Sequence, residues 1–200
     1  MSHYFINDPN LPDDFRSFRY FFAGLGFAFT SNSGVFSPGH VDPLSDLLIR
    51  TVPPLQGSLL DLGCGYGAIG IALAKAYDLT LALADINLRA LHCAHINCRD
   101  NAVKADIIRS DCFGNISGKF DAITLNPPIH AGKEVVYRMF GQSIEHLSAN
   151  GRLFVVMLEK HGAKSAIKKL SEIYGDCEIL YKKKGEYIFC CTKPNISIEK

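Results

Sequence analysis

The sequence predicts an α/β fold, in which a mainly parallel sheet of seven strands carries helices on both faces and ends in an antiparallel hairpin. Two observations support this prediction. Apolar runs typical of buried strands alternate with segments of helical periodicity, starting at residues 57–62. Near the C-terminus only Lys182–Gly185 separate the last two predicted strands. This connection is too short for a crossover helix, so these strands should run antiparallel.

Local signals place the individual elements. Strands are predicted at 57–62, 79–84, 105–109, 120–125, 152–158, 177–181 and 186–192, and helices at 69–77, 134–147 and 163–174. Asn87 is expected to cap a further helix, and Asp42-Pro43 to begin one that ends before Pro53. A β-hairpin is predicted from 27–30 and 35–37 around a turn at 31–34. We expect residues 1–52 to form an N-terminal extension of flap, hairpin and helix on a core domain of residues 53–200.

Composition limits the classes of function. The chain has 200 residues and a net charge of +1, so charge alone neither requires nor excludes a nucleic-acid partner. No apolar run approaches the ~18 residues of a membrane span, and residues 1–8 lack the features of a signal peptide. The seven cysteines form no C-x-x-C pair, so no metal site and a reducing cytoplasm are expected.

A glycine-rich turn follows the first core strand. Gly63, Gly65 and Gly67 can adopt positive φ and let a ligand approach the main chain closely. The unpaired N–H groups of the following helix should face that ligand. Asp61 stands at the strand end, where open α/β sheets bind their ligands. The G-x-G-x-G spacing differs from the G-x-G-x-x-G of dinucleotide-binding units, which argues against a nicotinamide oxidoreductase.

The next two strands also end in acidic residues. Asp85 follows the glycine turn by the roughly 20 residues at which such sheets place a ribose-binding carboxylate. Asp111 lies at the exit of the third strand. This order suits a nucleoside ligand, with a carboxylate on the ribose hydroxyls and a polar contact to the base.

The most specific signal is Asn126-Pro127-Pro128-Ile129, directly after the fourth strand. Neither proline has an N–H, and each pushes the residue before it away from helical geometry. The resulting stiff corner should point an amide oxygen and a carbonyl oxygen into the cleft. Two fixed acceptors suit an exocyclic amino group, because holding both hydrogens aims the nitrogen lone pair at an electrophile without a strong base.

With these motifs the chain resembles the S-adenosylmethionine-dependent methyltransferases that act on amino nitrogens. Asp61–Gly67 and Asn126–Ile129 carry that resemblance. More narrowly, Phe29–Ser37 and Asn126–Lys133 resemble the small-domain methyltransferases, a group that includes the bacterial 16S ribosomal RNA guanine-N2 methyltransferases. The similarity runs from about Phe27 to Thr192.

The resemblance implies a Rossmann-like methyltransferase fold, S-adenosyl-L-methionine (SAM) as cofactor, and methyl transfer to the N2 amine of a guanine in 16S rRNA. It also implies a cytoplasmic protein whose partner is structured RNA or the small ribosomal subunit, with no membrane partner. It puts the methionine end of the cofactor at the glycine turn, the ribose at Asp85, the adenine at Asp111 and the target amine at Asn126. The expected site residues are, for catalysis, Asn126, Pro127, Pro128 and Ile129; for the cofactor, Asp61, Gly63, Cys64, Gly65, Tyr66, Gly67, Asp85, Ile86, Asp111 and Cys112; and for the substrate, Phe36, His130 and Lys133.

The chain also departs from the family pattern. The larger rRNA enzymes carry an additional N-terminal domain, so RNA selection is expected to come from elsewhere here or to be weaker. Asp42-Pro43-Leu44-Ser45 stands where the family usually shows an aspartate followed by a glycine. Ile129 replaces the aromatic residue of many DNA-adenine and glutamine methyltransferases. An aromatic side chain would stack on a base for about 1–3 kcal/mol, so binding here should draw on other groups, such as Phe36.

Alternatives remain open from the sequence. The Asn-Pro-Pro corner could equally serve N-methylation of a glutamine side chain in a protein. A non-catalytic SAM- or RNA-binding module is a further hypothesis, against which the intact Asp61, Gly63, Asp85 and Asn126 argue. The stretch 1–26 mixes arginines with aromatic residues, which fits either an amphipathic flap on the domain or a nucleic-acid surface.

Overall fold

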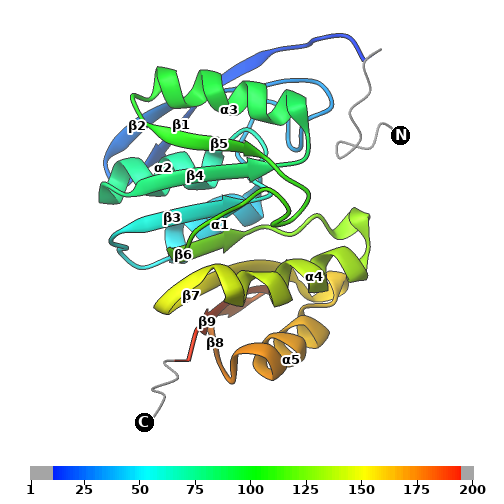
Figure 1. The fold of residues 1–200 in the computed structure, drawn as a ribbon. Coiled ribbons are helices and arrows are strands. Elements are labelled where there is room, and N and C mark those ends of the chain that lie inside the picture. The colour runs from blue at the N-terminus through cyan, green and yellow to red at the C-terminus, as the bar shows by residue number, and fades with distance from the viewer. Residues whose placement is uncertain (1–10, 195–200) are drawn as a thin grey trace.

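The structure, a computed structural model, describes residues 11–194. Residues 1–8, on which the expectation about a signal peptide rested, lie outside this range. The described part forms a seven-stranded sheet and a separate two-stranded hairpin. Figure 1 shows the strands of the large sheet one below another, from β5 near the top to β8 near the bottom.

The large sheet has the strand order β5-β4-β3-β6-β7-β9-β8. Its strands are β3 (Ser58–Leu62), β4 (Thr80–Asp85), β5 (Ala105–Arg109), β6 (Phe120–Leu125), β7 (Leu147–Leu158), β8 (Asp176–Lys183) and β9 (Glu186–Thr192). Strands β3 to β7 pair in parallel, whereas β9 runs antiparallel to both β7 and β8. The predicted fold class, a Rossmann-like methyltransferase sheet with an antiparallel C-terminal hairpin, is confirmed.

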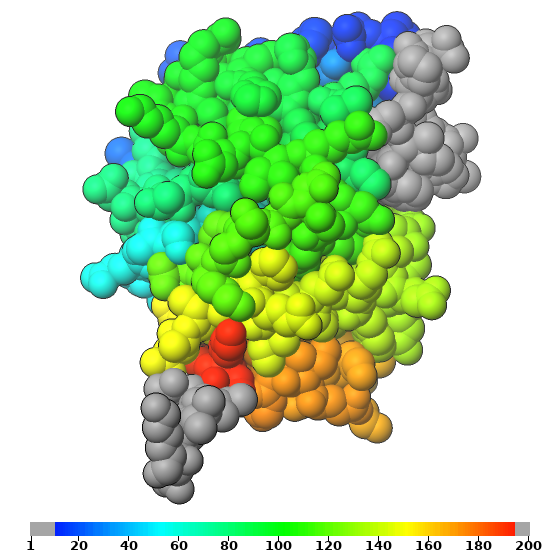
Figure 2. Space-filling model, in the orientation of Figure 1, coloured from blue at the N-terminus to red at the C-terminus, as the bar shows by residue number. Residues whose placement is uncertain are grey.

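Helices cover both faces of this sheet. One face packs against α1 (Pro43–Thr51), α2 (Ala68–Tyr77) and α3 (Leu88–Asp100), and the other against α4 (Lys133–Ser143) and α5 (Ala163–Tyr174). Side chains alternate along β3, so Leu59 joins the first core and Leu60 the second. Figure 2 shows α4 and α5 side by side at one end of the molecule.

The helix starts follow from their caps. The carboxylate of Asp42 accepts from Ser45 N at 3.0 Å, and the side chain of Asn87 accepts from Arg89 N at 2.9 Å. Both starts were predicted correctly. Helix α4 is shorter than predicted, because a 3₁₀ turn, η2 (Ile144–His146), follows it and Leu147 already begins β7, where it pairs with Phe120 of β6. Two more 3₁₀ turns are η1 (Ile129–Ala131) and η3 (Glu159–His161).

The predicted hairpin was wrong in its partner strand. Strand β2 (Leu25–Ser31) pairs with β1 (Arg16–Phe22), whereas residues 35–37 lie in a loop. The two-residue turn consists of Ala23 and Gly24, both with positive φ, at 50° and 74°. Positive φ at both positions is the geometry of a type I′ turn. The pair Ala-Gly lacks the usual Asn-Gly signature, so the sequence did not reveal it.

The hairpin packs on the α1–α3 side of the molecule, where Phe27 and Phe29 join the core. Asn97 of α3 and Asn101, which caps the C-terminal end of that helix, bond to the backbone of β2 as a neighbouring strand would. Asn97 accepts from Thr30 N and donates to Thr30 O, and Asn101 does the same with Ala28. These paired bonds hold the hairpin against the domain.

The cysteines differ from the expectation of a fully reduced set. A disulfide joins Cys177 on β8 to Cys191 on β9, while Cys64, Cys93, Cys98, Cys112 and Cys190 are free and buried. Cys177 and Cys191 are direct partners in the register of the two strands. The sequence could not predict this pair, because the register depends on a bulge between Ile179 and Tyr181.

Candidate active site

A cavity of about 310 Å³ opens at the carboxyl ends of β3, β4, β5 and β6. This is the edge at which open α/β sheets bind their ligands, and the volume falls at the lower end of the range for small-molecule sites. Of the expected site residues, the cavity is lined by Phe36, Gly63, Cys64, Gly65, Tyr66, Asp85, Ile86, Asp111, Cys112, Asn126, Pro127 and Pro128. Asp61, Gly67, Ile129, His130 and Lys133 do not line it.

The backbone N–H groups of the glycine turn bond within the protein, whereas the expectation of unpaired donors concerned the helix that follows, of which Gly70 N donates to Asp61. Gly63 N and Cys64 N both donate to Ala84 O, at 2.8 and 2.9 Å, and Gly65 N donates to the Asp85 carboxylate. These donors are therefore engaged within the protein. The turn offers space instead, since a Cβ at Gly65 would meet nothing within 4 Å. At φ +56° that position also favours glycine.

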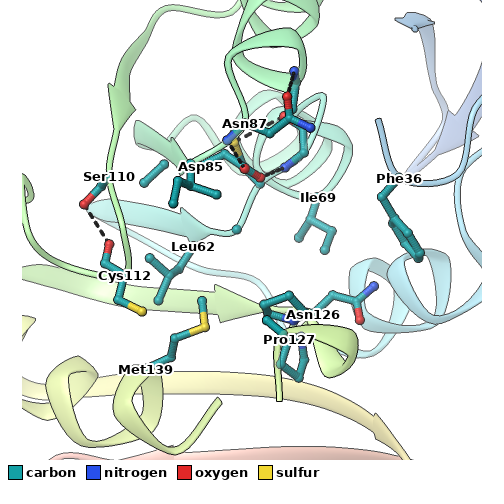
Figure 3. A pocket seen from close by; sticks show the side chains of 18 of the residues that line it. Phe36, Leu62, Ile69, Asp85, Asn87, Ser110, Cys112, Asn126, Pro127 and Met139 are labelled. Carbon is teal, nitrogen blue, oxygen red and sulfur yellow. Dashed lines mark hydrogen bonds between the residues drawn. The ribbon is translucent and has the colours of Figure 1, made fainter. Parts of the chain in front are cut away.

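Asp85 lies at the end of β4 and faces the cavity (Figure 3). Its Oδ2 accepts from Gly65 N at 2.8 Å, and its Oδ1 accepts from Asn87 N at 2.8 Å. Burial raises the pKa of this carboxyl, while the backbone donors act in the opposite direction. A carboxylate has about four acceptor positions. Backbone donors on Gly65, Ile86 and Asn87 use up to three of them, so a ribose would share the Asp85 oxygens with the turn.

Asp61 lies beneath the turn rather than in the cavity. Its Oδ2 accepts from Gly70 N at 2.9 Å, and its Oδ1 accepts from Thr124 Oγ1 at 3.0 Å. The carboxyl is 1% exposed, and burial raises its pKa to about 7. Gly70 approaches so closely that a Cβ there would stand 2.9 Å from the Cβ of Asp61. Asp61 therefore fixes the start of α2 against β3 and β6, which positions the turn.

Asp111 and Cys112 follow β5 and line the far wall of the cavity. Asp111 Oδ1 accepts from Arg138 Nη2 of α4 at 2.7 Å, in an exposed ion pair. Ser110 Oγ donates to Cys112 O at 2.8 Å and shapes the same loop. The adenine contact expected of Asp111 would therefore come from a carboxylate that an arginine already orients.

Asn126 stands at the mouth of the cavity, next to Pro127 and on the side facing Phe36 (Figure 3). Its Nδ2 donates to Asp42 Oδ2 at 3.1 Å and to Ser45 Oγ at 3.0 Å. Both hydrogens of the amide are thereby used, and Oδ1 is left as its acceptor. Pro128 O accepts from Ala131 N at 2.9 Å, so the carbonyls of Asn126 and Pro127 are the candidates for a second acceptor.

The two thiols beside the site are not poised as nucleophiles. Burial raises the pKa of Cys64 and of Cys112 above the ordinary value. Burial likewise raises the pKa of the Tyr66 phenol, which donates to His40 O at 2.9 Å. The chemistry available here is hydrogen-bond acceptance and positioning rather than covalent catalysis.

Sequence reasoning missed several contributors to the site. Asp42 and Ser45 orient Asn126 from 84 and 81 residues away, Asn87 lines the cavity, and Arg138 pairs with Asp111. The departure at Asp42-Pro43-Leu44-Ser45 is visible in the sequence, but nothing there signals its contact with the Asn-Pro-Pro corner. Ile129, His130 and Lys133 lie in η1 and at the start of α4, beside the cavity rather than in it.

Two kinds of feature are absent from residues 11–194. No cluster of three or more histidine, cysteine, aspartate or glutamate side chains is arranged there to hold a metal ion. No helix in that range has the length and apolar character required to cross a membrane.

Comparison with known proteins decides the family. The methyltransferase small-domain family matches residues 26–190. The chain belongs to this family. Membership confirms, at the level of the family, the expected methyltransferase and its cofactor, S-adenosylmethionine.

Individual relatives of this methyltransferase differ in how much of their length it covers. A Bacillus subtilis protein, named uncharacterized protein YbxB, is 41% identical over 96% of this chain and 98% of its own length. The ribosomal RNA small subunit methyltransferase C of Pasteurella multocida is 40% identical over 62% of this chain, but over only 39% of its own.

A solved structure extends the comparison to the fold. The Thermus thermophilus 16S rRNA N2 G1207 methyltransferase RsmC, in complex with AdoMet and guanosine, superposes with a TM-score of 0.80 at 28% identity. The match covers 92% of this methyltransferase and 52% of RsmC. The chain thus spans about half the length of these rRNA enzymes.

Proposed function

We propose that this methyltransferase transfers the methyl group of SAM to the exocyclic N2 amine of a guanine in 16S rRNA. The observation that carries the proposal is the orientation of Asn126. Asp42 and Ser45 hold its Nδ2 at 3.1 and 3.0 Å, so the amide presents oxygen rather than nitrogen as its remaining polar atom. An acceptor at this position suits a substrate that offers N–H donors.

The residues of the cavity fit the cofactor as well as the target. The open space above Gly65 suits close approach of the methionine end, and the Asp85 carboxylate suits the ribose hydroxyls. Ile86 and Cys112 offer apolar contact for the adenine. When bound, SAM supplies an electrophilic methyl group on a sulfonium centre.

The part played by the chain is to bind and orient the amine. Asn126 Oδ1 accepts one hydrogen of the guanine amine, and the carbonyl of Asn126 or Pro127 accepts the other. Both contacts strengthen as the nitrogen loses its conjugation with the ring, which is the condition for catalysis by differential binding. Phe36, which is 39% exposed at the mouth, offers apolar contact to the base.

The relatives named as ribosomal RNA small subunit methyltransferase C support RNA as the substrate. By this proposal the partner is 16S rRNA or the small ribosomal subunit, in the cytoplasm. This chain spans about half the length of those relatives or less, so the choice of 16S rRNA as the substrate is part of the proposal.

The proposal is tested by methyl transfer. The purified protein is incubated with labelled SAM and either 16S rRNA or small subunits from a strain that lacks the gene, and the RNA is digested to nucleosides. We expect label in N2-methylguanosine with wild-type protein, and almost none with Asn126→Ala. Label absent from RNA and present on a protein glutamine would overturn the proposal in favour of the alternative substrate.

A further inference from the structure

Three segments far apart in the sequence meet at the edge of the sheet that carries the cavity. Strand β6 ends just before Asn126 and runs parallel to β7, so β7 ends at the same edge, in η3. Strand β9 runs antiparallel to β7 and pairs Glu186 with Leu158. The turn between β8 and β9 therefore lies at this edge too, and Glu159 N donates to Gly185 O at 2.7 Å.

The cations on these segments form what we call the basic rim, which is defined by Lys133, Lys160, Lys182, Lys183, Lys184, His130 and His161. All seven side chains are exposed. Burial lowers the pKa of His161, as do the charges of Lys160 and His130. The electrostatic influence of His130 on His161 indicates that η1, next to the catalytic corner, lies near η3.

The charge of the rim is not cancelled by its surroundings. The three segments also contain Glu134, Glu159 and Glu186. Glu159 is paired with Lys164 at 2.6 Å and is also influenced by Lys182 of the rim, and Glu186 lies opposite Lys183 in the hairpin. The five lysines of the rim still outnumber these three glutamates. The chain as a whole has 21 basic and 20 acidic side chains, so the rim concentrates positive charge on an otherwise balanced molecule.

We propose that the basic rim binds RNA phosphates that flank the methylated nucleotide. This inference rests on the proposed function. A base that enters the cavity must leave its stack, and the phosphates on either side of it then lie at the mouth. Lysine side chains on flexible stems suit phosphates whose positions vary, because the ammonium group acts as a point charge. The rim would thus supply backbone affinity without sequence specificity.

The test compares two triple variants with equal loss of charge. Lys182→Gln/Lys183→Gln/Lys184→Gln alters the rim, and Lys75→Gln/Arg99→Gln/Lys104→Gln alters exposed cations at the opposite edge, where β4 and β5 begin. Binding to a 16S rRNA fragment is measured between 50 and 200 mM salt, which is about the range in which phosphate contacts are resolved.

We expect the rim variant to bind RNA roughly tenfold more weakly at low salt. Its salt slope should fall by about 0.7–0.9 for each phosphate that the variant no longer neutralises. The control variant should keep the wild-type slope, and both should keep the wild-type affinity for SAM. Equal slopes in the two variants would overturn the proposal. If the protein bound polyglutamate as tightly as RNA, and the rim variant weakened both to the same extent, RNA would not be the specific occupant of the rim.

Two further measurements separate the possible explanations of a weaker binding. Lys182 Nζ lies 5.5 Å from the centre of the Tyr187 ring, so the triple change also removes a cation–π contact within the hairpin. The variant Lys133→Gln/Lys160→Gln leaves that hairpin intact and should lower the slope in the same direction. If the wild-type protein binds RNA through the rim but methylates no RNA, the proposed function is wrong and the rim proposal stands. If the protein methylates RNA but both rim variants keep the wild-type salt slope, only the rim proposal is wrong.

Discussion

Asn126 Nδ2 donates to Asp42 Oδ2 at 3.1 Å, and this contact joins the Asn-Pro-Pro corner to the cap of α1. The same Oδ2 atom accepts from Ser45 N at 3.0 Å, so one carboxylate both starts the helix and orients the amide. Ser45 Oγ takes the other amide hydrogen at 3.0 Å. The segment Asp42-Pro43-Leu44-Ser45, in which the chain departs from the family pattern, thus contacts the proposed catalytic residue through Asp42 and Ser45.

Ser45→Ala tests this orienting contact with little change in shape. The substitution removes one of two acceptors of the Asn126 amide and keeps the cap of α1, which uses the Ser45 backbone. A hydrogen bond is worth about 0.5–1.5 kcal/mol net, so we expect kcat to fall roughly two- to tenfold. The dissociation constant of SAM should not change. The matched control is Ser17→Ala on the exposed face of β1, and an unchanged kcat in Ser45→Ala would remove Ser45 from the positioning of Asn126.

Asp85→Ala tests the cofactor assignment. The carboxylate is expected to hold both ribose hydroxyls, and loss of a charge-assisted hydrogen bond costs about 1.5–3 kcal/mol. We therefore expect calorimetry to show SAM binding weakened by about ten- to a hundredfold. Asp106→Ala, an exposed aspartate on the neighbouring β5, should leave the affinity unchanged. If Asp85→Ala bound SAM like the wild type, Asp85 could not be the ribose ligand.

Asp121 is a poor control for that experiment. Asp121 lies on β6 and does not line the cavity. In the structure its Oδ2 accepts from Ser58 N and Ser58 Oγ, each at 2.9 Å, and its Oδ1 accepts from Ser148 Oγ at 2.7 Å. These bonds favour the charged form and lower its pKa. Removing the Asp121 side chain would remove hydrogen bonds that join β6 to β3 and β7.

The parallel core and the Asn126 corner could be predicted because each rests on local signals. Apolar runs mark the strands, and the prolines after β6 fix the corner whatever the rest of the chain does. The roles of Asp61 and of the turn N–H groups could not be predicted in the same way. Whether Asp61 faces a ligand or Gly70 depends on how α2 packs against β3. The contact of Asp42 with Asn126 depends likewise on where α1 lies relative to β6.

Asp61 should make the stability of the protein depend on pH. Burial raises the pKa of this carboxyl to about 7 in the folded state, from an ordinary value of 3.8. Between these values the folded protein keeps a proton that the unfolded chain has lost, so stability falls as pH rises through this window. Each pKa unit corresponds to about 1.4 kcal/mol, which sets an upper bound of roughly 4 kcal/mol. The loss should be complete above about pH 7.

Asp61→Asn isolates this contribution. Asparagine can still accept from Gly70 N and can donate to Thr124 Oγ1, but it carries no charge. Denaturant unfolding at pH 5 and pH 8 should show the variant gaining stability relative to wild type as pH rises. Asp106→Asn, on the surface of β5, is the control, and its free energy of unfolding should change with pH as that of the wild type does. A constant difference between Asp61→Asn and wild type would mean that Asp61 does not titrate in this range.

Asn126 allows the sharpest test of the chemistry. Asn126→Ala removes an acceptor whose bond to the target amine strengthens as the nitrogen attacks the methyl group. Such a contact is typically worth about 2.7–4 kcal/mol, or 10²–10³ in rate. We expect kcat to fall by that factor with little change in the dissociation constant of SAM, because Asn126 lies at the mouth of the cavity rather than on the first three strands. Near-wild-type turnover in a folded, SAM-bound Asn126→Ala would refute the amine-orienting mechanism.

Asn126→Asp separates acceptance from orientation. From the sequence alone this variant should keep part of its activity, because an acceptor oxygen remains. The structure reverses that expectation, since the second carboxylate oxygen would replace Nδ2 at 3.1 Å from Asp42 Oδ2. Two carboxylates at this distance repel, so the side chain should turn away and kcat should fall as far as in Asn126→Ala. The same Oδ2 position accepts from Ser45 N, so Asp42→Asn alone weakens the cap of α1 and is the control for that loss. The double variant Asp42→Asn/Asn126→Asp restores a donor opposite an acceptor. It should regain part of the activity, and a double variant no faster than Asn126→Asp would show that Asp42 does not orient the catalytic residue.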